Sequence, residues 1–370
     1  MTDEARFTLG VEEEYQVVDA ASGDLSEQAG AVLEEARRQL GDAAQPELWR
    51  SQVEAGTPVC ETLVEVRREL VRMRRAMLDA AAPLGLRVVA SGTHPRSSWR
   101  GQEVTPKQRY RALESEGRQV AKETLIFGTH VHVACGDEET TIGVMNRSRP
   151  WLPALLALSA SSPFWEGDDT GFASYRTILF RRWPTAGAPL AFRDRAEYDA
   201  LVGALTAAGT IPDATRLYWD MRPSARYPTL EFRVADACPT VDETVMIAGL
   251  TRGVAMRAER DHAAGAAPVD LRHELLEAAI WQAARDGLDG ELVDLERAGR
   301  LPAALLVERL LEHVRPGLEE RGEWEEVEGL VRQTLGRGNG ATRQRAAFQR
   351  RGRVDDVVEL VGGEVSQGLG

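Results

Sequence analysis

The stretch TLGVEEEYQVV, residues 8–18, constrains the fold of this chain most strongly, because apolar and polar side chains alternate along it. Such alternation is typical of a β-strand, whose successive side chains point to opposite faces. Glu12 and Glu14 share the polar face, about 7 Å apart given the rise of a strand, while Glu13 alone interrupts the apolar face. Two neighbouring carboxylates need water, a base or a cation beside them. The strand is therefore either the solvated face of an antiparallel sheet or part of a metal site.

Two later stretches repeat this pattern. In FGTHVHVAC, His130 and His132 share one face, so both imidazoles can bind a metal ion or form hydrogen bonds within a sheet. In TLEFRVA, Glu231 and Arg233 share the face opposite the apolar residues, which also fits a simple cross-strand salt bridge. Neither stretch alone decides between these interpretations.

A fourth stretch, ELWRSQVEA, looks extended and carries Glu54 on the face opposite Val53. If the four polar faces lie on one side of a sheet, the following side chains converge: Glu12, Glu14, Glu54, Glu231 and His130 or His132. Such a cluster would need cations to be stable. Because most of the donors are oxygens, the pattern favours Mg²⁺ or Mn²⁺ over Zn²⁺.

Arginines accompany these carboxylates, among them Arg176, Arg222 and Arg233. Their planar guanidinium groups suit phosphate and carboxylate partners. Carboxylates that bind cations, together with arginines that bind oxyanions, are typical of phosphoryl-transfer enzymes.

Composition narrows the class of protein. The chain has 370 residues, 28% of them charged, and a formal net charge of −13, which argues against nucleic acid or an anionic membrane as its main partner. Cys60, Cys135 and Cys238 are far apart, which predicts reduced thiols and a cytoplasmic location. The most apolar window, 151–163, is too short to span a bilayer, and the first residues do not resemble a secretion signal.

The order of predicted elements indicates an α+β fold. Strands and helices alternate with short connections up to about residue 241, which favours a substantially antiparallel sheet, and 242–370 is largely helical. Thr57 and Pro58 are predicted to begin a helix as its N-cap and first residue. We expect a single domain over 1–370, because no linker separates the two parts.

Several motifs resemble the carboxylate–amine ligase family, also called glutamate–cysteine ligase type 2. They are GVEEEYQVVD, QVEAGTPVC, SGTHP, FGTHVHV, RPWLPALLALSASSPFWEGDDTGFASYR, RRWPTAGAP, WDMRPS and TLEFRVADACPTVDETV, and the match extends to ATRQRAAFQRRGRVDDVVELV. The resemblance implies a glutamine-synthetase-like fold, in which a curved, mainly antiparallel sheet binds ATP and divalent cations while helices pack on its outer side. It also implies ATP-dependent amide formation from small-molecule carboxylate and amine substrates, with glutamate and cysteine as one pair, and a possible homodimer.

The resemblance further implies roles for individual residues. Glu12, Glu14, Glu54 and Glu231 match positions of metal ligands, and His130 is favoured over His132 as a further ligand. Arg233, Arg222 and Arg176 would stabilise charge on the transferring phosphoryl group, and Trp219, Ser161 and Arg233 would bind the nucleotide. Glu13 and Cys60 are expected to serve packing rather than catalysis.

Two other functions remain open from the residues alone. A metal-dependent amidohydrolase could use the H-x-H pair and carboxylates to activate water, although its usual barrel requires repeated βα units. A catalytically inactive nucleotide-binding protein would keep the ligands and bind ATP without turnover.

Overall fold

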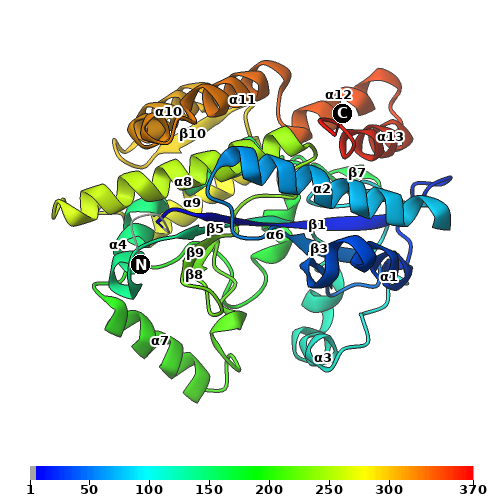
Figure 1. Cartoon of the computed structure of the whole chain (residues 1–370), viewed down its shortest axis with the longest axis horizontal. Coiled ribbons are helices and arrows are strands. Elements are labelled where there is room, and N and C mark those ends of the chain that lie inside the picture. Colours follow the sequence, from blue (N-terminus) through cyan, green and yellow to red (C-terminus); the bar gives the residue numbers. More distant parts are fainter. Residues whose placement is uncertain (1–5, 370) are drawn as a thin grey trace.

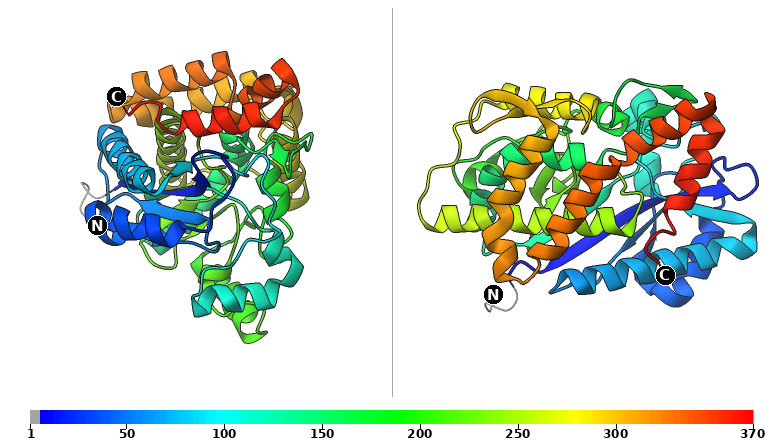
Figure 2. Two further views of the ribbon diagram at one scale, coloured as in Figure 1. Left: turned by 90° about the vertical axis from the view of Figure 1, so that its right-hand side faces the viewer. Right: turned by 90° about the horizontal axis from the view of Figure 1, so that it is seen from above.

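The computed structural model describes residues 6–369, which form a sheet covered by helices on one face and open on the other. Two long helices, α2 (Leu63–Ala81) and α8 (Val241–Ala263), lie side by side on the covered face (Figure 1). Helices α10 (Ala303–Glu320) and α11 (Trp324–Arg337) pack on α8 as a further layer (Figure 2). None of the helices in residues 6–369 is both long and apolar enough to cross a membrane.

The main sheet has seven strands in the order β2-β3-β1-β5-β9-β8, with β4 also paired to β1. Their bounds are β1 (Leu9–Asp19), β2 (Ala44–Pro46), β3 (Gln52–Gly56), β4 (Leu86–Val89), β5 (Thr129–Ala134), β8 (Met221–Pro223) and β9 (Thr229–Phe232). All of these pairings are antiparallel, which confirms the predicted α+β class. An antiparallel sheet is not the parallel barrel that the amidohydrolase alternative requires.

The register of this sheet aligns the polar positions of neighbouring strands. Glu12 pairs with His130 and Glu14 with Glu54, while His132 pairs with Glu231 on the following strand. Directly paired residues point to the same face. The register therefore gathers the predicted polar side chains on the face that α2 and α8 leave open.

The apolar face of β1 packs on α2 and α8. Leu9, Val11, Tyr15 and Val17 are buried there against the apolar stripe of α2, which comprises Leu63, Val66, Leu70, Met73 and Met77. Glu13 lies on this same face, fully buried, and forms an ion pair with Arg74 of α2. As predicted, Glu13 is on the core side of the strand.

The remaining helices and strands surround this core. They are α1 (Ala29–Leu40), α3 (Gln108–Glu123), α4 (Glu138–Ser148), α5 (Leu152–Ser159), α6 (Tyr175–Phe180), α7 (Arg195–Ala207), α9 (His273–Asp286), α12 (Gly340–Arg351), α13 (Val354–Glu364), β6 (Phe164–Trp165), β7 (Asp168–Asp169), β10 (Glu291–Asp294) and β11 (Gly299–Pro302). Helices α3 and α7 project below the sheet, one at each side of its open face (Figure 1).

One predicted boundary is wrong. Helix α2 begins at Leu63, and its N-cap is Thr62, whose hydroxyl accepts a hydrogen bond from the Glu65 amide at 3.2 Å. The prediction that Thr57 and Pro58 begin this helix is wrong, because the chain from Thr57 to Cys60 first runs along β1. Cys60 exchanges two backbone hydrogen bonds with Leu9, both at 2.8 Å, and the Thr57 hydroxyl accepts one from the Val11 amide at 3.0 Å.

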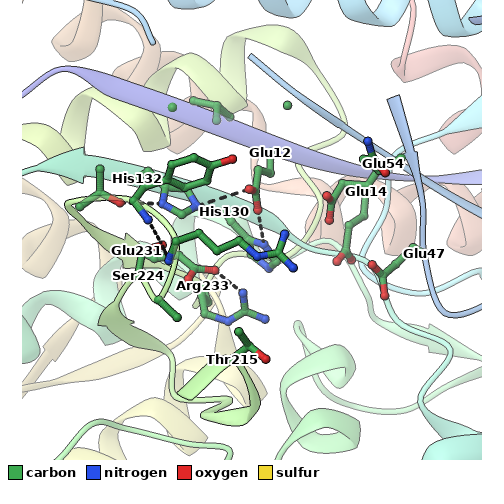
Figure 3. A pocket seen from close by; sticks show the side chains of 18 of the residues that line it. Glu12, Glu14, Glu47, Glu54, His130, His132, Thr215, Ser224, Glu231 and Arg233 are labelled. Carbon is green, nitrogen blue, oxygen red and sulfur yellow. Dashed lines mark hydrogen bonds and ion pairs between the residues drawn. The ribbon is translucent and has the colours of Figure 1, made fainter. Parts of the chain in front are cut away.

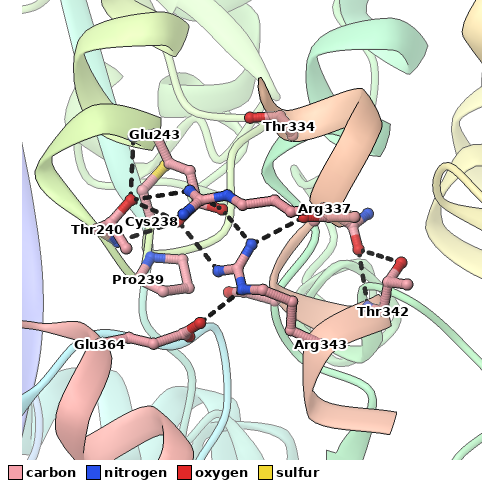
Figure 4. A network of polar contacts seen from close by, with 12 residues as sticks. Cys238, Pro239, Thr240, Glu243, Thr334, Arg337, Thr342, Arg343 and Glu364 are labelled. Carbon is pink, nitrogen blue, oxygen red and sulfur yellow. Dashed lines mark hydrogen bonds and ion pairs between the residues drawn. The ribbon is translucent and has the colours of Figure 1, made fainter. Parts of the chain in front are cut away.

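A buried ionic network fixes the C-terminal helices to α8 (Figure 4). Glu243, in the first turn of α8, accepts a hydrogen bond from Arg343 of α12 at 2.8 Å and lies 3.4 Å from Arg337 of α11. Arg343 also pairs with Glu364 of α13. Burial raises the pKa of Glu364. The network thus joins α8, α11, α12 and α13 through buried charged side chains, each of which is compensated by an oppositely charged partner.

Candidate active site

The open face of the sheet forms the floor of a cavity of about 1090 Å³. Six strands of the main sheet contribute lining residues, namely β2, β3, β1, β5, β9 and β8, and α3, α6 and the segment between β8 and β9 supply the walls. Such a volume exceeds the usual range for one drug-sized ligand. The cavity therefore has room for a nucleotide and a second small molecule.

Three side chains in this cavity form a group suited to a metal ion. Carboxylate oxygens of Glu12 and Glu231 and one ring nitrogen of His132 all lie within 4.8 Å of one another. His132 Nδ1 is 2.9 Å from the hydroxyl of Thr229, and its buried Nε2 lies 3.5 Å from Glu12 Oε1. An imidazole held at one nitrogen, with the other turned toward carboxylates, is suited to act as a metal ligand. The donor set therefore fits a divalent cation.

The second histidine has a different environment. His130 Nδ1 lies 3.3 Å from Glu12 Oε2, and burial, followed by the charge of Arg233, lowers the pKa of His130 to about 4. Burial alone would raise the pKa of Glu12, but hydrogen bonds to His130 and His132 outweigh it and lower that pKa well below its usual value. The sequence favoured His130 as the ligand, whereas the structure places His132 in the three-residue group (Figure 3).

A second acidic set lies beside the first and includes a residue that the sequence analysis missed. Glu14, Glu47 and Glu54 approach one another at one side of the cavity (Figure 3). Burial, followed by the charge of Glu47, raises the pKa of Glu14 to about 7, and burial together with neighbouring carboxylates raises the pKa of Glu54 well above its usual value. Carboxylates that repel one another in a buried place are typical of sites that bind cations.

The three predicted arginines all line the cavity, but they have different partners. Arg222 donates to Glu231 Oε2 at 2.9 Å, and Arg233 pairs with the other oxygen of the same carboxylate. Glu231 consequently has a pKa well below its usual value, because the two guanidinium groups outweigh its burial. Arg176 instead donates to the carbonyl of Arg233 at 3.2 Å, and its Nε has no partner.

Arg176 owes its position to Gly128, which immediately precedes β5. A Cβ atom at position 128 would lie 2.5 Å from the Arg176 guanidinium, and the Gly128 amide donates to Glu14 at 2.6 Å. Replacing Gly128 with alanine should therefore displace the Arg176 guanidinium. We expect a turnover about 10- to 100-fold lower with an unchanged melting temperature, because small misplacements of catalytic groups have effects of this size.

Gly56→Ala is the matched control for this substitution. Gly56 lines the same cavity, but its Cβ would meet Glu12 Cγ at 3.7 Å, which is an ordinary contact. If the two alanine variants have equal turnover, Gly128 has no special role in placing Arg176.

Two predicted nucleotide-binding residues do not line the cavity. Ser161 is fully buried, where its hydroxyl donates to the Ala237 carbonyl at 2.9 Å and accepts from the Gly92 amide at 3.0 Å. Trp219 packs in the apolar core against Phe192, with ring centres 5.8 Å apart. Both side chains have structural partners, and neither is among the residues that line the cavity.

Two solved structures share the architecture of this chain. The chain superposes with a TM-score of 0.72 on a glutamate–cysteine ligase from Francisella tularensis determined in complex with AMP, at 12% identity, covering 99% of this chain and 90% of that one. It superposes with a TM-score of 0.70 on a bifunctional glutathione synthetase from Pasteurella multocida, at 16% identity, covering 98% of this chain and 52% of that one. The chain therefore shares the fold of these two proteins.

Residues 8–360 match the model of glutamate–cysteine ligase family 2, and the chain belongs to this family. It is 45% identical to a proposed glutamate–cysteine ligase 2-2 of Frankia casuarinae, covering 98% of this chain and 42% of that protein. It is 44% identical to a proposed glutamate–cysteine ligase 2-2 of Frankia alni, covering 98% of this chain and 97% of that one. The chain thus spans less than half of one relative and nearly all of another.

Proposed function

We propose that this chain is an ATP-dependent carboxylate–amine ligase that forms an amide bond through an acyl phosphate. The observation that carries the proposal is the group formed by Glu12, His132 and Glu231, which faces a cavity also lined by Arg222 and Arg233. Metal-binding carboxylates next to arginines are what a phosphoryl transfer to a carboxylate requires. The names of the family and of the relatives support glutamate as the acid and cysteine as one amine.

The residues present fit a divalent cation, and the predominance of carboxylates supports Mg²⁺ or Mn²⁺. Glu12, His132 and Glu231 would hold one ion, and Glu14, Glu47 and Glu54 offer oxygens for others. When bound, such ions neutralise phosphate oxygens and align the attacking and leaving groups. The Thr229 hydroxyl beside His132 Nδ1 would keep the imidazole in the orientation that turns Nε2 toward Glu12.

In the first step, an oxygen of the substrate carboxylate forms a bond to the γ-phosphorus of ATP, and the bond from that phosphorus to the bridging oxygen of ADP breaks. Negative charge shifts onto ADP and the transferring phosphoryl group. Arg176, Arg222 and Arg233 line the cavity where that charge develops. Fixed guanidinium groups in a buried site stabilise such charge without having to reorganise.

In the second step, the amine nitrogen bonds to the acyl carbon, inorganic phosphate leaves with the electron pair of the broken carbon–oxygen bond, and the nitrogen loses a proton. The acyl phosphate must be protected from water until the amine arrives. Walls supplied by α3 and α6 flank the cavity and would limit the access of water. The three cysteines are buried and free, in keeping with a reducing cytoplasm.

The experiment that tests the proposal measures ADP release from ATP and Mg²⁺ in the presence of glutamate and a panel of amines that includes cysteine. We expect release that depends on both the acid and the amine, with stoichiometric amide detected by mass spectrometry. The control omits the amine and measures background hydrolysis. A well-folded preparation that releases no amine-dependent ADP with any pair would contradict the proposal.

A further inference from the structure

A buried carboxylate lies behind Arg176. Asp236 Oδ1 is 3.9 Å from Arg176 Nη1, and among residues 6–369 no other carboxylate forms an ion pair with this guanidinium. Arg176 lines the cavity, whereas Asp236 is fully buried and is not among the lining residues. The hydrogen bonds of the guanidinium go to the carbonyls of Arg233 and Val234, at 3.2 and 3.5 Å. Asp236 is therefore the ion-pair partner of Arg176 on the side away from the cavity.

Two serine hydroxyls connect Asp236 to helix α6, which carries Arg176. Ser162 Oγ donates to Asp236 Oδ2 at 2.7 Å, and Ser174 Oγ donates to Asp236 Oδ1, also at 2.7 Å. Ser162 Oγ in turn accepts the Arg176 backbone amide at 3.1 Å. Ser174 is the N-cap of α6, and its hydroxyl accepts the Thr177 amide at 3.4 Å. Because a hydroxyl has one hydrogen to donate, the carboxylate fixes the direction from which each serine accepts.

The carboxylate itself has little freedom to move. The Ser161 amide is its third donor, at 2.9 Å from Oδ2, and a Cβ atom at Gly92 would lie 2.7 Å from Asp236 Cγ. Burial raises the pKa of Asp236, whereas the charge of Arg176 and the hydrogen bonds from the three serines lower it. A buried carboxylate with these partners acts as a fixed negative charge.

On the cavity side, the Arg176 guanidinium lies over Gly128. Gly128 pairs with Asp236 in an isolated antiparallel bridge, so the same two chain segments support the arginine from below and from behind. Arg176 Nε is buried and has no hydrogen-bond partner. The guanidinium is thus held firmly but keeps an unused N–H, as expected of a group that binds an anion formed only during a reaction.

We propose that Asp236 is a positioning residue of the ligase reaction, which holds Arg176 through Ser162 and Ser174 in the orientation that stabilises the transferring phosphoryl group. This assignment rests on the proposed function for the role of Arg176. Asp236 touches neither substrate nor nucleotide, and its effect comes from the placement of a charge that need not reorganise. A misplacement of that charge by about 1 Å lowers turnover up to about 100-fold.

The kinetic test measures amine-dependent ADP release in Asp236→Asn, which keeps the size of the side chain but removes its charge. We expect kcat to fall about 10- to 100-fold while KM changes less than about twofold, because the charge on the phosphoryl group develops only in the transition state. In a protein that already carries Arg176→Gln, the same substitution should lower kcat less than about twofold further. Equal losses in the two backgrounds would overturn the assignment, since Asp236 would then act on the fold as a whole.

A second measurement does not depend on turnover. In protein labelled with ¹⁵N-arginine, the Nε–Hε resonance of Arg176 is identified by its absence from Arg176→Gln. Asp236→Asn should shift or broaden this resonance. Ser162→Ala removes one hydroxyl between Asp236 and Arg176 while keeping the carboxylate, so it should also move the resonance and serves if Asp236→Asn does not fold. A resonance that stays in place in either folded variant would overturn the assignment.

Asp294→Asn is the matched control, because Asp294 is also a buried aspartate that accepts a backbone amide, from Glu296 at 3.1 Å, and pairs with an arginine, Arg309, outside the cavity. It should leave both kcat and the Arg176 resonance unchanged. Melting curves show that each variant is folded. If wild-type protein releases no amine-dependent ADP, the proposed function fails, and the resonance still decides whether Asp236 positions Arg176.

Discussion

Replacing Glu12 with glutamine is expected to lower amine-dependent ADP release at least about 100-fold in a protein that still folds. Glu12 is the acidic residue that contacts both histidines: its oxygens lie 3.3 Å from His130 Nδ1 and 3.5 Å from His132 Nε2. The amide keeps the shape of the side chain but removes the negative charge that a cation needs. Titration with Mn²⁺, followed by electron paramagnetic resonance, should show weaker binding in the same variant.

The control for this experiment is Glu34→Gln, which makes the same chemical change on the exposed surface of α1. It should leave turnover and Mn²⁺ affinity unchanged. If Glu12→Gln behaves like this control in an active preparation, the carboxylates of the sheet do not bind a catalytic cation. The proposed mechanism then fails, although the fold and the family do not depend on it.

The floor of this site could be predicted because it depends only on strand periodicity. Once β1 is taken as a strand, Glu12 and Glu14 must share a face, and the same rule applies to His130 and His132. The structure confirms that these positions lie on one face of an antiparallel sheet. Their roles as metal ligands stay a prediction that the substitution of Glu12 tests.

The walls of the site could not be predicted in this way. Glu47 reaches the acidic set from the connection between β2 and β3, and its carboxylate accepts a hydrogen bond from the Leu48 amide at 3.0 Å. Its position therefore does not follow strand alternation. The choice between the two histidines depends on Thr229, which belongs to a strand about 100 residues away. Contacts across such separations follow from the packing of loops, and no local pattern in the sequence carries them.

Ser161 illustrates a different difficulty. It lies in a motif that resembles the family, and the structure uses it to hold the 91–92 segment and Asp236 together through hydrogen bonds of 2.9 and 3.0 Å. A motif residue can therefore serve buried groups that need a hydrogen-bond partner. Resemblance alone does not distinguish such a residue from one that touches a ligand.

Replacing Arg74 with methionine is expected to destabilise the protein by about 3–5 kcal/mol, which is a large share of the stability of a typical domain. Arg74 is fully buried and donates two hydrogen bonds to Glu13, one of them 3.0 Å long. It also donates to the carbonyls of Cys238 and Pro239, both at 2.8 Å, and so joins β1, α2 and the segment before α8. Urea unfolding measures the change in free energy.

The loss arises mainly because Glu13 would remain buried without its cation, and this reasoning predicts the behaviour of the double variant. Glu13→Leu combined with Arg74→Met removes both charges, and we expect it to be more stable than Arg74→Met alone. The Cys238 and Pro239 carbonyls lose their donor in both proteins, so that shared loss cancels in the comparison. Glu13→Leu also leaves the buried hydroxyls of Tyr15 and Thr244 without the Glu13 carboxylate as their acceptor, so the gain measures the unpaired carboxylate less these two lost hydrogen bonds. A double variant no more stable than the single one would contradict the view that the unpaired carboxylate is the main cost on the core face of a strand whose other face holds the site.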